Sequence, residues 1–297
     1  MLHQLRLVFC CSSILIQISI TTLLLGAKKS NSLSIHPISS NIYSHRVTKI
    51  KPNIHRSMSS GSEAEAMPTF PNRIPEERLG TKHDSLEAFY KASFGTTSPP
   101  SRKTKEYTLI VVTETLQQTP KQQRILLGLK NRGFGTGKYN SFGGKFLHDE
   151  TNSSGEIETV EECACRELEE ETNLTIPLET MKASKVGVQR FTFSDNEKEM
   201  LVHLFFLDLA SRPMPYEIKP CEEITPKWFE SFDSVPLNNM FADDSLWLTA
   251  LLTRAASIET PVVGPPLEIN GSYHFAQNCE ETNTILHHYM EVREPSA

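Results

Sequence analysis

Cysteine is scarce in this sequence and is not arranged for cross-linking. Six cysteines occur among 297 residues, and two of them, Cys10 and Cys11, lie close to the N-terminus. The remaining four show neither CxxC pairs nor the spacing of a zinc finger. This pattern argues against a disulfide framework or a structural zinc site, and it favours a reducing compartment.

Acidic residues are absent from the first 62 positions, which hold seven Lys and Arg. Residues 7–25 are mostly apolar but are interrupted by serine, threonine and glutamine. Two interpretations are open: a secretory signal followed by a transit-like segment, or a mitochondrial presequence. A retained membrane anchor is a third, since the apolar run is only just long enough to span a bilayer. We expect a targeting leader over 1–62 that directs the chain to an organelle (plastid or mitochondrion), without stable membrane association after its removal. An internal start at Met58 or Met67 would instead give a cytoplasmic or nuclear form.

The rest of the chain is acidic. The whole sequence has 30 Lys and Arg against 36 Asp and Glu, so without the seven leader bases 23 bases face 36 acids, a net charge of −13 over 63–297. Such a body argues against binding to a nucleic acid polymer. It remains compatible with a small phosphorylated substrate, provided that metal ions mediate the binding.

Three segments follow the leader. Residues 63–104 are rich in proline and serine and predict a linker with one short helix at 84–93, whereas 105–293 are expected to form a single domain and 294–297 a tail. Apolar and β-branched runs predict strands at 107–112 and 124–130 (a hairpin), 186–193, 200–209, 228–229, 273–275 and 285–289. A second helix is expected at 246–254, followed by a long loop at 258–272.

The acids of one predicted helix, within 158–174, lie on an unusual face. At about 100° per residue the apolar stripe covers roughly one third of the wheel; its members are Val160, Cys163, Ala164 and Leu168. Glu167, Glu170 and Glu171 project beside this stripe, and their i, i+3, i+4 spacing makes them repel one another. Half-burying three carboxylates is costly unless positive charge compensates. Arg166 offers one charge, and a divalent, oxygen-binding cation would supply the rest. A solvated acidic helix is the alternative.

A glycine-dense stretch, 132–145, precedes this helix. Such density lets the backbone approach a ligand closely, although glycine-rich loops are often simple turns. The acidic helix that follows favours the ligand-binding interpretation.

Gly144, Glu158 and residues 166–174 together resemble a Nudix box. The family's pattern is Gly, five residues, Glu, seven residues, then Arg-Glu-apolar-x-Glu-Glu-x-Gly-apolar. Eight extra residues separate Gly144 from Glu158, and we interpret the polar run 147–155 as a surface insertion. Asn173 stands where the family has glycine, and asparagine is the next-best residue for a helix end with positive φ. The resemblance extends over about 106–292 and implies an α+β fold, the Nudix α/β/α sandwich, with a mixed β-sheet between helices.

The resemblance also implies the catalytic and metal-binding residues. The expected catalytic group is Glu167, Glu170, Glu171 and Arg166, with Glu170 or Glu171 positioning or deprotonating water. Mg²⁺ (Mn²⁺ possible as a substitute) is expected at the three glutamates, completed by the Gly143 carbonyl and Glu223. Glu158 is expected to brace the helix by pairing with Arg166.

Within the Nudix family the sequence is most similar to the oxidised purine nucleoside triphosphate hydrolases, the MutT homologues that clear 8-oxo-dGTP and 2-hydroxy-dATP. This implies a set of substrate contacts: Thr108, Lys130, Phe134, Asn140, Phe142, Gly143, Gly144, Lys145, Phe191, Phe193, Phe241, Asp243 and Asp244. Adjacent aspartates at 243 and 244 could share a proton and so bind different oxidised purines. Alternatives stay open: an Asp as helix N-cap, Asn140 as a turn residue, and the phenylalanines as core.

The expected function is Mg²⁺-dependent hydrolysis of oxidised purine nucleoside triphosphates to a monophosphate and pyrophosphate, carried out by a monomer. Two alternatives remain: hydrolysis of another nucleotide such as a dinucleoside polyphosphate, or nucleotide binding without catalysis. The intact set Glu167, Glu170 and Glu171 argues against the last.

Overall fold

The computed structural model describes residues 67–116, 122–148, 155–211, 216–258, 265–277 and 283–294. All of these lie in one compact unit, Gly61–Ala297. The expected leader therefore lies outside the described residues, as do the centre of the 147–155 insertion and most of the C-terminal tail. In the described part of the chain, no helix has the length and apolar character that a membrane crossing requires.

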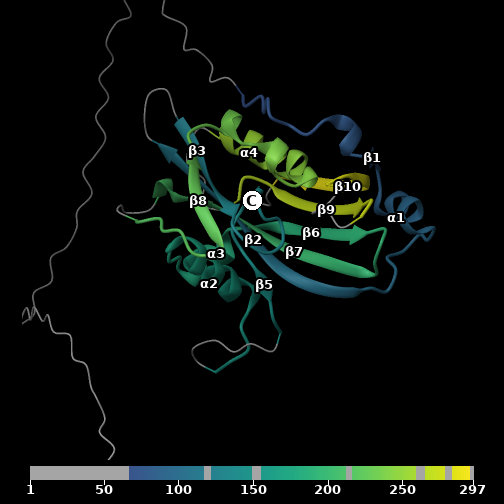
Figure 1. Cartoon of the computed structure of the whole chain (residues 1–297), viewed down its shortest axis with the longest axis horizontal. Helices are drawn as coiled ribbons and strands as arrows, with labels where there is room; N and C mark the ends of the chain where they lie inside the picture. Colours follow the sequence, from purple (N-terminus) through teal and green to yellow (C-terminus); the bar gives the residue numbers. More distant parts are fainter. Residues whose placement is uncertain are drawn as a thin grey trace, which may run out of the picture. The chain divides into compact units, whose positions relative to one another are not determined.

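The strands form one mixed sheet (Figure 1). Its spatial order is β1-β10-β9-β6-β7-β2-β3-β4, while β5 pairs with β2 and β8 with β3. The strands are β1 (Thr81–Lys82), β2 (Lys103–Leu116), β3 (Gln122–Lys130), β4 (Tyr139–Asn140), β5 (Lys145–Phe146), β6 (Lys185–Phe193), β7 (Lys198–Asp208), β8 (Ile224–Phe229), β9 (Glu268–Phe275) and β10 (Ile285–Arg293). The predicted hairpin is confirmed, because β2 and β3 pair antiparallel. Parallel pairing of β2 with β7 and of β6 with β9 makes the sheet mixed.

Helices cover both faces of the sheet (Figure 1). The α-helices are α1 (Leu86–Phe94), α2 (Val160–Thr172), α3 (Leu178–Ala183) and α4 (Trp247–Ala256). Short 3₁₀ turns are η1 (Glu76–Arg78), η2 (Leu209–Ser211), η3 (Phe232–Ser234), η4 (Leu237–Asn239) and η5 (Ala242–Ser245). One core cluster lies between the sheet and α4, and a second lies between the sheet and the α2–α3 side. The α+β sandwich is confirmed.

Both ends of α2 have the local structure that its sequence favours. Thr159 and Glu162 form a reciprocal capping box, in which the Thr159 hydroxyl accepts from the Glu162 amide and the Glu162 carboxylate accepts from the Thr159 amide. Asn173 ends the helix at φ 64°, as expected for asparagine in place of glycine. These caps fix where α2 begins and ends, and therefore where its glutamates lie on the helix.

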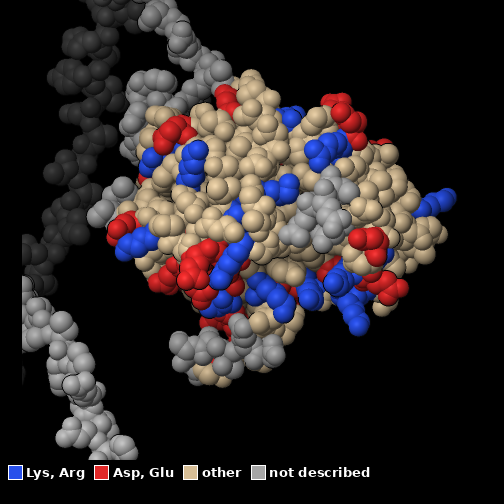
Figure 2. Space-filling view, in the orientation of Figure 1, with Lys and Arg blue, Asp and Glu red and all other residues tan. Residues whose placement is uncertain are grey.

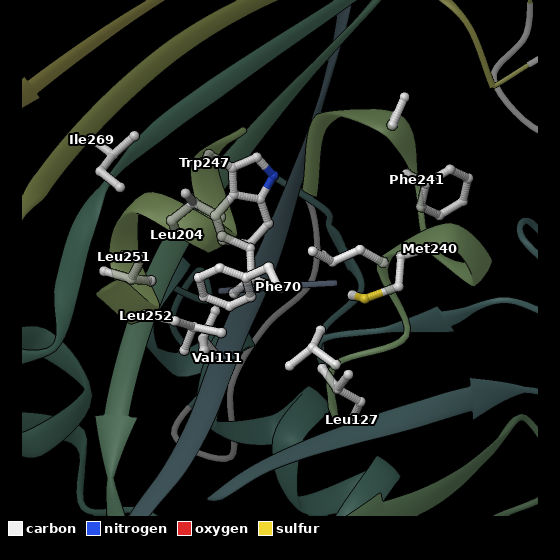
Figure 3. Packing of buried hydrophobic residues seen from close by; sticks show 14 of the residues in the cluster. Phe70, Val111, Leu127, Leu204, Met240, Phe241, Trp247, Leu251, Leu252 and Ile269 are labelled. Carbon is white, nitrogen blue, oxygen red and sulfur yellow. The ribbon is translucent and has the colours of Figure 1, made fainter. Parts of the chain in front are cut away.

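The expected linker, 63–104, is partly a structural element. Phe70, Ile74 and Leu79 are buried in the α4-side core, and Figure 3 shows the Phe70 ring beside Trp247. Strand β1 pairs in parallel with β10, and helix α1 follows it. The linker prediction is therefore wrong over 67–82, because a proline-rich segment can still bury scattered apolar side chains against distant elements. The short helix expected at 84–93 is confirmed as α1. The loop expected at 258–272 is also shorter, since β9 already begins at Glu268.

Candidate active site

The loop between β4 and β5 is attached to β2 by its backbone. Ile110 and Phe142 exchange two hydrogen bonds, and the Thr108 amide donates to the Gly144 carbonyl at 2.9 Å. Gly143 has φ 139°, and a Cβ there would lie 2.2 Å from the Thr108 carbonyl oxygen. Only glycine fits so close to β2, so the strand dictates the course of this loop.

The same loop lies directly against two glutamates of α2. The Gly143 amide donates to Glu171 Oε2 at 2.8 Å. A Cβ on Gly144 would lie 2.2 Å from Glu167 Oε2, so this glycine lets the carboxylate approach the backbone. The loop and the helix thus form one unit, as expected for a Nudix box despite the longer insertion.

Burial and mutual repulsion disfavour negative charge on these glutamates. Burial raises the pKa of Glu171 to about 7, opposed by the Gly143 amide and Lys130 and reinforced by the charges of Glu167 and Glu223. Burial also raises the pKa of Glu167, against the effect of Arg166. Glu170 is different, because its side chain is 61% exposed. The site therefore combines a buried acid, Glu171, and a half-buried one, Glu167, with Glu170, which remains in water.

Two basic side chains neutralise part of this cluster. Lys130 Nζ lies 2.7 Å from Glu223 Oε1 and 3.7 Å from Glu171 Oε1. Arg166 Nη1 lies 2.8 Å from Glu167 Oε1 and 3.6 Å from Glu170 Oε2. Figure 2 shows acidic side chains gathered over the α2 region with basic side chains among them. Lys130 therefore lies among the acids that were expected to hold the metal.

Arg166 also pairs with Glu158, as the sequence predicted. Its Nε and Nη2 atoms donate to the two carboxylate oxygens of Glu158 at 2.9 and 3.1 Å. Glu158 is only 7% exposed at its side chain. The guanidinium joins the loop before α2 to the glutamates on the helix, which gives Glu158 the geometry of a brace.

The acid cluster has the chemistry of a divalent-cation site. No three His, Cys, Asp or Glu side chains of the described residues converge into a preformed metal cage. Mg²⁺ does not need one, because it keeps several waters and binds through few carboxylates. Glu167, Glu170, Glu171 and Glu223 give four carboxylates to two cations, and Arg166 is shared with Glu158. Burial is the main cause that raises the pKa of Glu171, and a cation bound beside it would offset this cost of burying the charge. The residues present therefore fit a hard divalent ion.

A second polar cluster lies on the α4 side of the sheet. Asp243 and Asp244 are 6% and 2% exposed. Asp243 accepts a hydrogen bond from the Trp247 indole at 2.9 Å, and Asp244 accepts one from the Phe241 amide at 3.0 Å. Burial raises the pKa of Asp243 to about 6, and burial together with the Asp243 charge raises the pKa of Asp244 well above its ordinary value. The aspartates thus accept hydrogen bonds from residues of their own turn and of the helix that follows it. They also form the adjacent acidic pair that could share a proton.

Aromatic rings border this cluster. Phe134, 42% exposed, stacks on Phe241 with ring centroids 5.3 Å apart. Phe191 is half-buried and stacks on Tyr273, also at 5.3 Å. Phe193 is 5% exposed and belongs to the core, which is the alternative that the sequence left open for the phenylalanines. Phe134 and Phe191 are therefore the more accessible phenylalanines of the predicted set.

Several predicted substrate contacts are not brought to this cluster. Phe142 is fully buried in the core beneath α2, on the opposite face from Asp243, so the structure does not bring it beside the aspartates. Thr108 is buried too, and its hydroxyl accepts from the Gly144 amide at 3.4 Å, so it supports the loop. Lys145 is exposed on β5. Asn140 Oδ1 accepts from the Ser141 amide at 2.9 Å, which is the turn interaction considered as its alternative.

The structure adds two residues that the sequence analysis did not select. Trp247 binds Asp243 through its indole N–H, an i, i+4 pairing that the spacing could have indicated. Lys138 Nζ lies 5.6 Å from the Phe241 ring centroid, and its charge opposes the raised pKa of Asp244. Lys138 lies two residues before Asn140, inside the glycine-dense stretch, and this position in the sequence could have indicated its place near the ligand.

Comparison with known proteins identifies the family. Residues 119–249 match the NUDIX domain model. The chain is 41% identical over 133 residues to an oxidized purine nucleoside triphosphate hydrolase of Danio rerio, covering 44% of this chain and 73% of that relative. It is 38% identical over 148 residues to the protein of the same name in Mus musculus, covering 50% and 80%. The chain belongs to the Nudix hydrolase family.

Solved structures add little to this assignment. The MutT protein of Methanosarcina mazei Go1 is 17% identical, with a TM-score of 0.38, over 54% of this chain and 100% of that one. At that TM-score the likeness carries no argument, so the family assignment rests on the sequence relatives.

Proposed function

We propose that this Nudix hydrolase converts oxidised purine nucleoside triphosphates to monophosphate and pyrophosphate with Mg²⁺. The observation that carries the proposal is one continuous segment, 130–144, that contacts both polar clusters. Lys130 and Gly143 contact the glutamate cluster, while Phe134 and Lys138 contact Phe241 beside the aspartates. A ligand along this segment would carry phosphates at one end and a base at the other, as a nucleotide does.

The glutamate cluster suits the phosphate end. Glu167, Glu170, Glu171 and Glu223 would hold Mg²⁺, and a bound ion of this kind neutralises phosphate charge and lowers the pKa of water. The Gly143 amide fixes Glu171, and Arg166 fixes Glu167. The exposed Glu170 is free to meet a water molecule from solvent and orient it for in-line attack. The protein's own part is therefore to position the carboxylates and the nucleophile.

The aspartate cluster suits the base end. Two adjacent buried carboxyls with raised pKa values favour a shared proton, so one acid donates while the other accepts. Exchanging which acid carries the proton lets the same pair bind purines with different edges. The names of the relatives, which specify oxidised purine nucleotides, agree with this assignment.

The test is pyrophosphate release with Mg²⁺ from 8-oxo-dGTP, 2-hydroxy-dATP, dGTP and a dinucleoside polyphosphate. We expect kcat/KM for the oxidised nucleotides to exceed that for dGTP. Equal values for dGTP and 8-oxo-dGTP would refute the preference for oxidised bases, and preference for the dinucleoside polyphosphate would favour a different Nudix substrate.

A matched pair of variants tests the catalytic assignment. Glu170→Gln should lower turnover at least about 100-fold while nucleotide binding persists. Glu169→Gln is the control, because Glu169 lies on the same helix, is exposed and accepts a hydrogen bond from the Thr175 hydroxyl, away from the glutamate cluster. Retained turnover in Glu170→Gln would contradict the role of Glu170.

A further inference from the structure

Two buried polar side chains on the α4-side face of the sheet lack hydrogen-bond partners. Gln189 and Tyr273 are both 0% exposed. Across the described residues, no group hydrogen-bonds to the Gln189 amide oxygen, its amide nitrogen or the Tyr273 hydroxyl. Leaving three such atoms unpaired in a core is costly, so a native structure that keeps them calls for an explanation.

The sheet register places these two side chains together. In the parallel pairing of β6 with β9, Gln189 is opposite Gly271, and Phe191 is opposite Tyr273. Residues two apart on a strand share a face, so all four positions lie on one face. A Cβ on Gly271 would be 2.0 Å from Gln189 Oε1 and 2.7 Å from the Tyr273 hydroxyl. Glycine at 271 thus lets both polar groups occupy the space above it.

This pair adjoins the proposed base site. The half-buried ring of Phe191 stacks on the Tyr273 ring with centroids 5.3 Å apart, so Tyr273 lies directly beside an aromatic of the predicted substrate set. Tyr273 belongs to the same core cluster as Phe241 and Trp247, which donate hydrogen bonds to Asp244 and Asp243. Burial raises the pKa of Tyr273, and the charges of Asp243 and Asp244 raise it further. Gln189, Tyr273 and the aspartates therefore belong to one polar region within an otherwise apolar face.

We propose that Gln189 and Tyr273 form the inner wall of the base pocket and hydrogen-bond to the polar edge of the bound purine. This rests on the proposed function. An amide supplies two donors and one acceptor, and a phenol supplies one donor and accepts as well. Their complement is a purine edge that alternates exocyclic keto or amino groups with ring nitrogens. The structure therefore assigns specificity to the inner wall in addition to the aspartate pair.

Chemical removal of single base groups tests direct contact. We would measure kcat/KM of wild type, Gln189→Met and Tyr273→Phe on the deoxynucleoside triphosphates of 8-oxoguanine, 8-oxohypoxanthine (no 2-amino group) and 8-oxo-2-aminopurine (no 6-keto group). Each variant should lose about tenfold or more on 8-oxoguanine and much less on the analogue lacking the contacted group. No loss, or an equal loss on all three bases, would overturn the proposal.

Thr192→Val is the matched control. Thr192 lies on the opposite face of β6, and its hydroxyl contacts the Tyr273 carbonyl and His274. This variant should not change the ratio among the three bases. Gln189→Met and Tyr273→Phe remove unpartnered polar atoms, so their melting temperatures should equal or exceed the wild-type value, which separates lost recognition from misfolding.

Binding distinguishes this proposal from the proposed function. If wild type releases no pyrophosphate from oxidised purine nucleotides, the proposed function is refuted, but this result does not decide the inner-wall proposal. Calorimetry with the corresponding monophosphates, without metal, then tests the inner wall. The same base-dependent loss of affinity in the two variants supports it, and unchanged or uniformly reduced affinity overturns it.

Discussion

Replacing Arg166 with methionine tests how the acidic helix is held. The substitution keeps an unbranched side chain but removes the guanidinium that binds Glu158 at 2.9 and 3.1 Å and Glu167 at 2.8 Å. Glu158 and Glu167, with side chains 7% and 17% exposed, would then keep their charge without this partner. The perturbation therefore leaves buried carboxylates uncompensated.

The magnitude follows from the burial of the pair. Removing one partner of a buried ion pair costs about 3–5 kcal/mol. Arg166 itself is 32% exposed at its side chain, so water screens part of the loss and about 3 kcal/mol is expected. For a domain of this size that corresponds to a fall in Tm of about 6–12 °C. Glu158→Gln should cost about 2 kcal/mol, and the double variant little more than Arg166→Met alone, because the second change removes a charge that is already unpaired.

The assay is urea unfolding of the full chain, followed by circular dichroism, for the two single variants and the double variant. Arg293→Met is the control, because Arg293 forms a surface pair with Glu291 and its side chain is 58% exposed, so its loss should leave the free energy of unfolding close to the wild-type value. Additive effects of Glu158→Gln and Arg166→Met, or an Arg166→Met cost no larger than that of the control, would refute the brace.

Two further predictions concern the loop and the aspartates. Gly144→Ala places a Cβ 2.2 Å from Glu167 Oε2. We therefore expect the Mg²⁺ concentration for half-maximal activity to rise at least about tenfold. A Cβ at Gly95 meets nothing within 4 Å, so Gly95→Ala should leave that concentration unchanged. Asp243→Asn concerns pH. The folded pKa of Asp243 is raised to about 6, so its contribution to stability is present below its ordinary value of 3.8 and is lost as pH rises through about 6. Wild type should therefore lose about 2 kcal/mol relative to Asp243→Asn between pH 4 and 7, measured by urea unfolding, and a constant difference would contradict the burial of charge there.

Local patterns predicted the catalytic helix well. The spacing of Glu167, Glu170 and Glu171 beside an apolar stripe depends only on helical periodicity, and α2 has the expected ends, including Asn173 at positive φ. The pairing of β2 with β3 followed from two nearby β-branched runs. The salt bridge between Arg166 and Glu158 was also predictable, since Glu158 lies just before α2 and Arg166 lies at its centre.

Contacts between distant segments were less predictable. Phe70 and Ile74 lie in a proline-rich stretch without periodicity, so their burial depends on α4 and β9, which are more than 150 residues away. Phe142 and Phe193 lie in two different core clusters, and the sequence does not say which face of the sheet each ring occupies once strands pair. Gln189 and Tyr273 were not selected for the same reason.

The sequence by itself determined the acid cluster of this protein, because one helix with its preceding loop contains Glu158, Arg166 and the three glutamates at short range. Only the tertiary structure decided the other end of the site. There the parallel pairing of β6 with β9 and the packing of η5 bring Asp243, Asp244, Gln189 and Tyr273 together from three separate stretches of chain. Register and packing are properties of the assembled sheet, and no local periodicity encodes them.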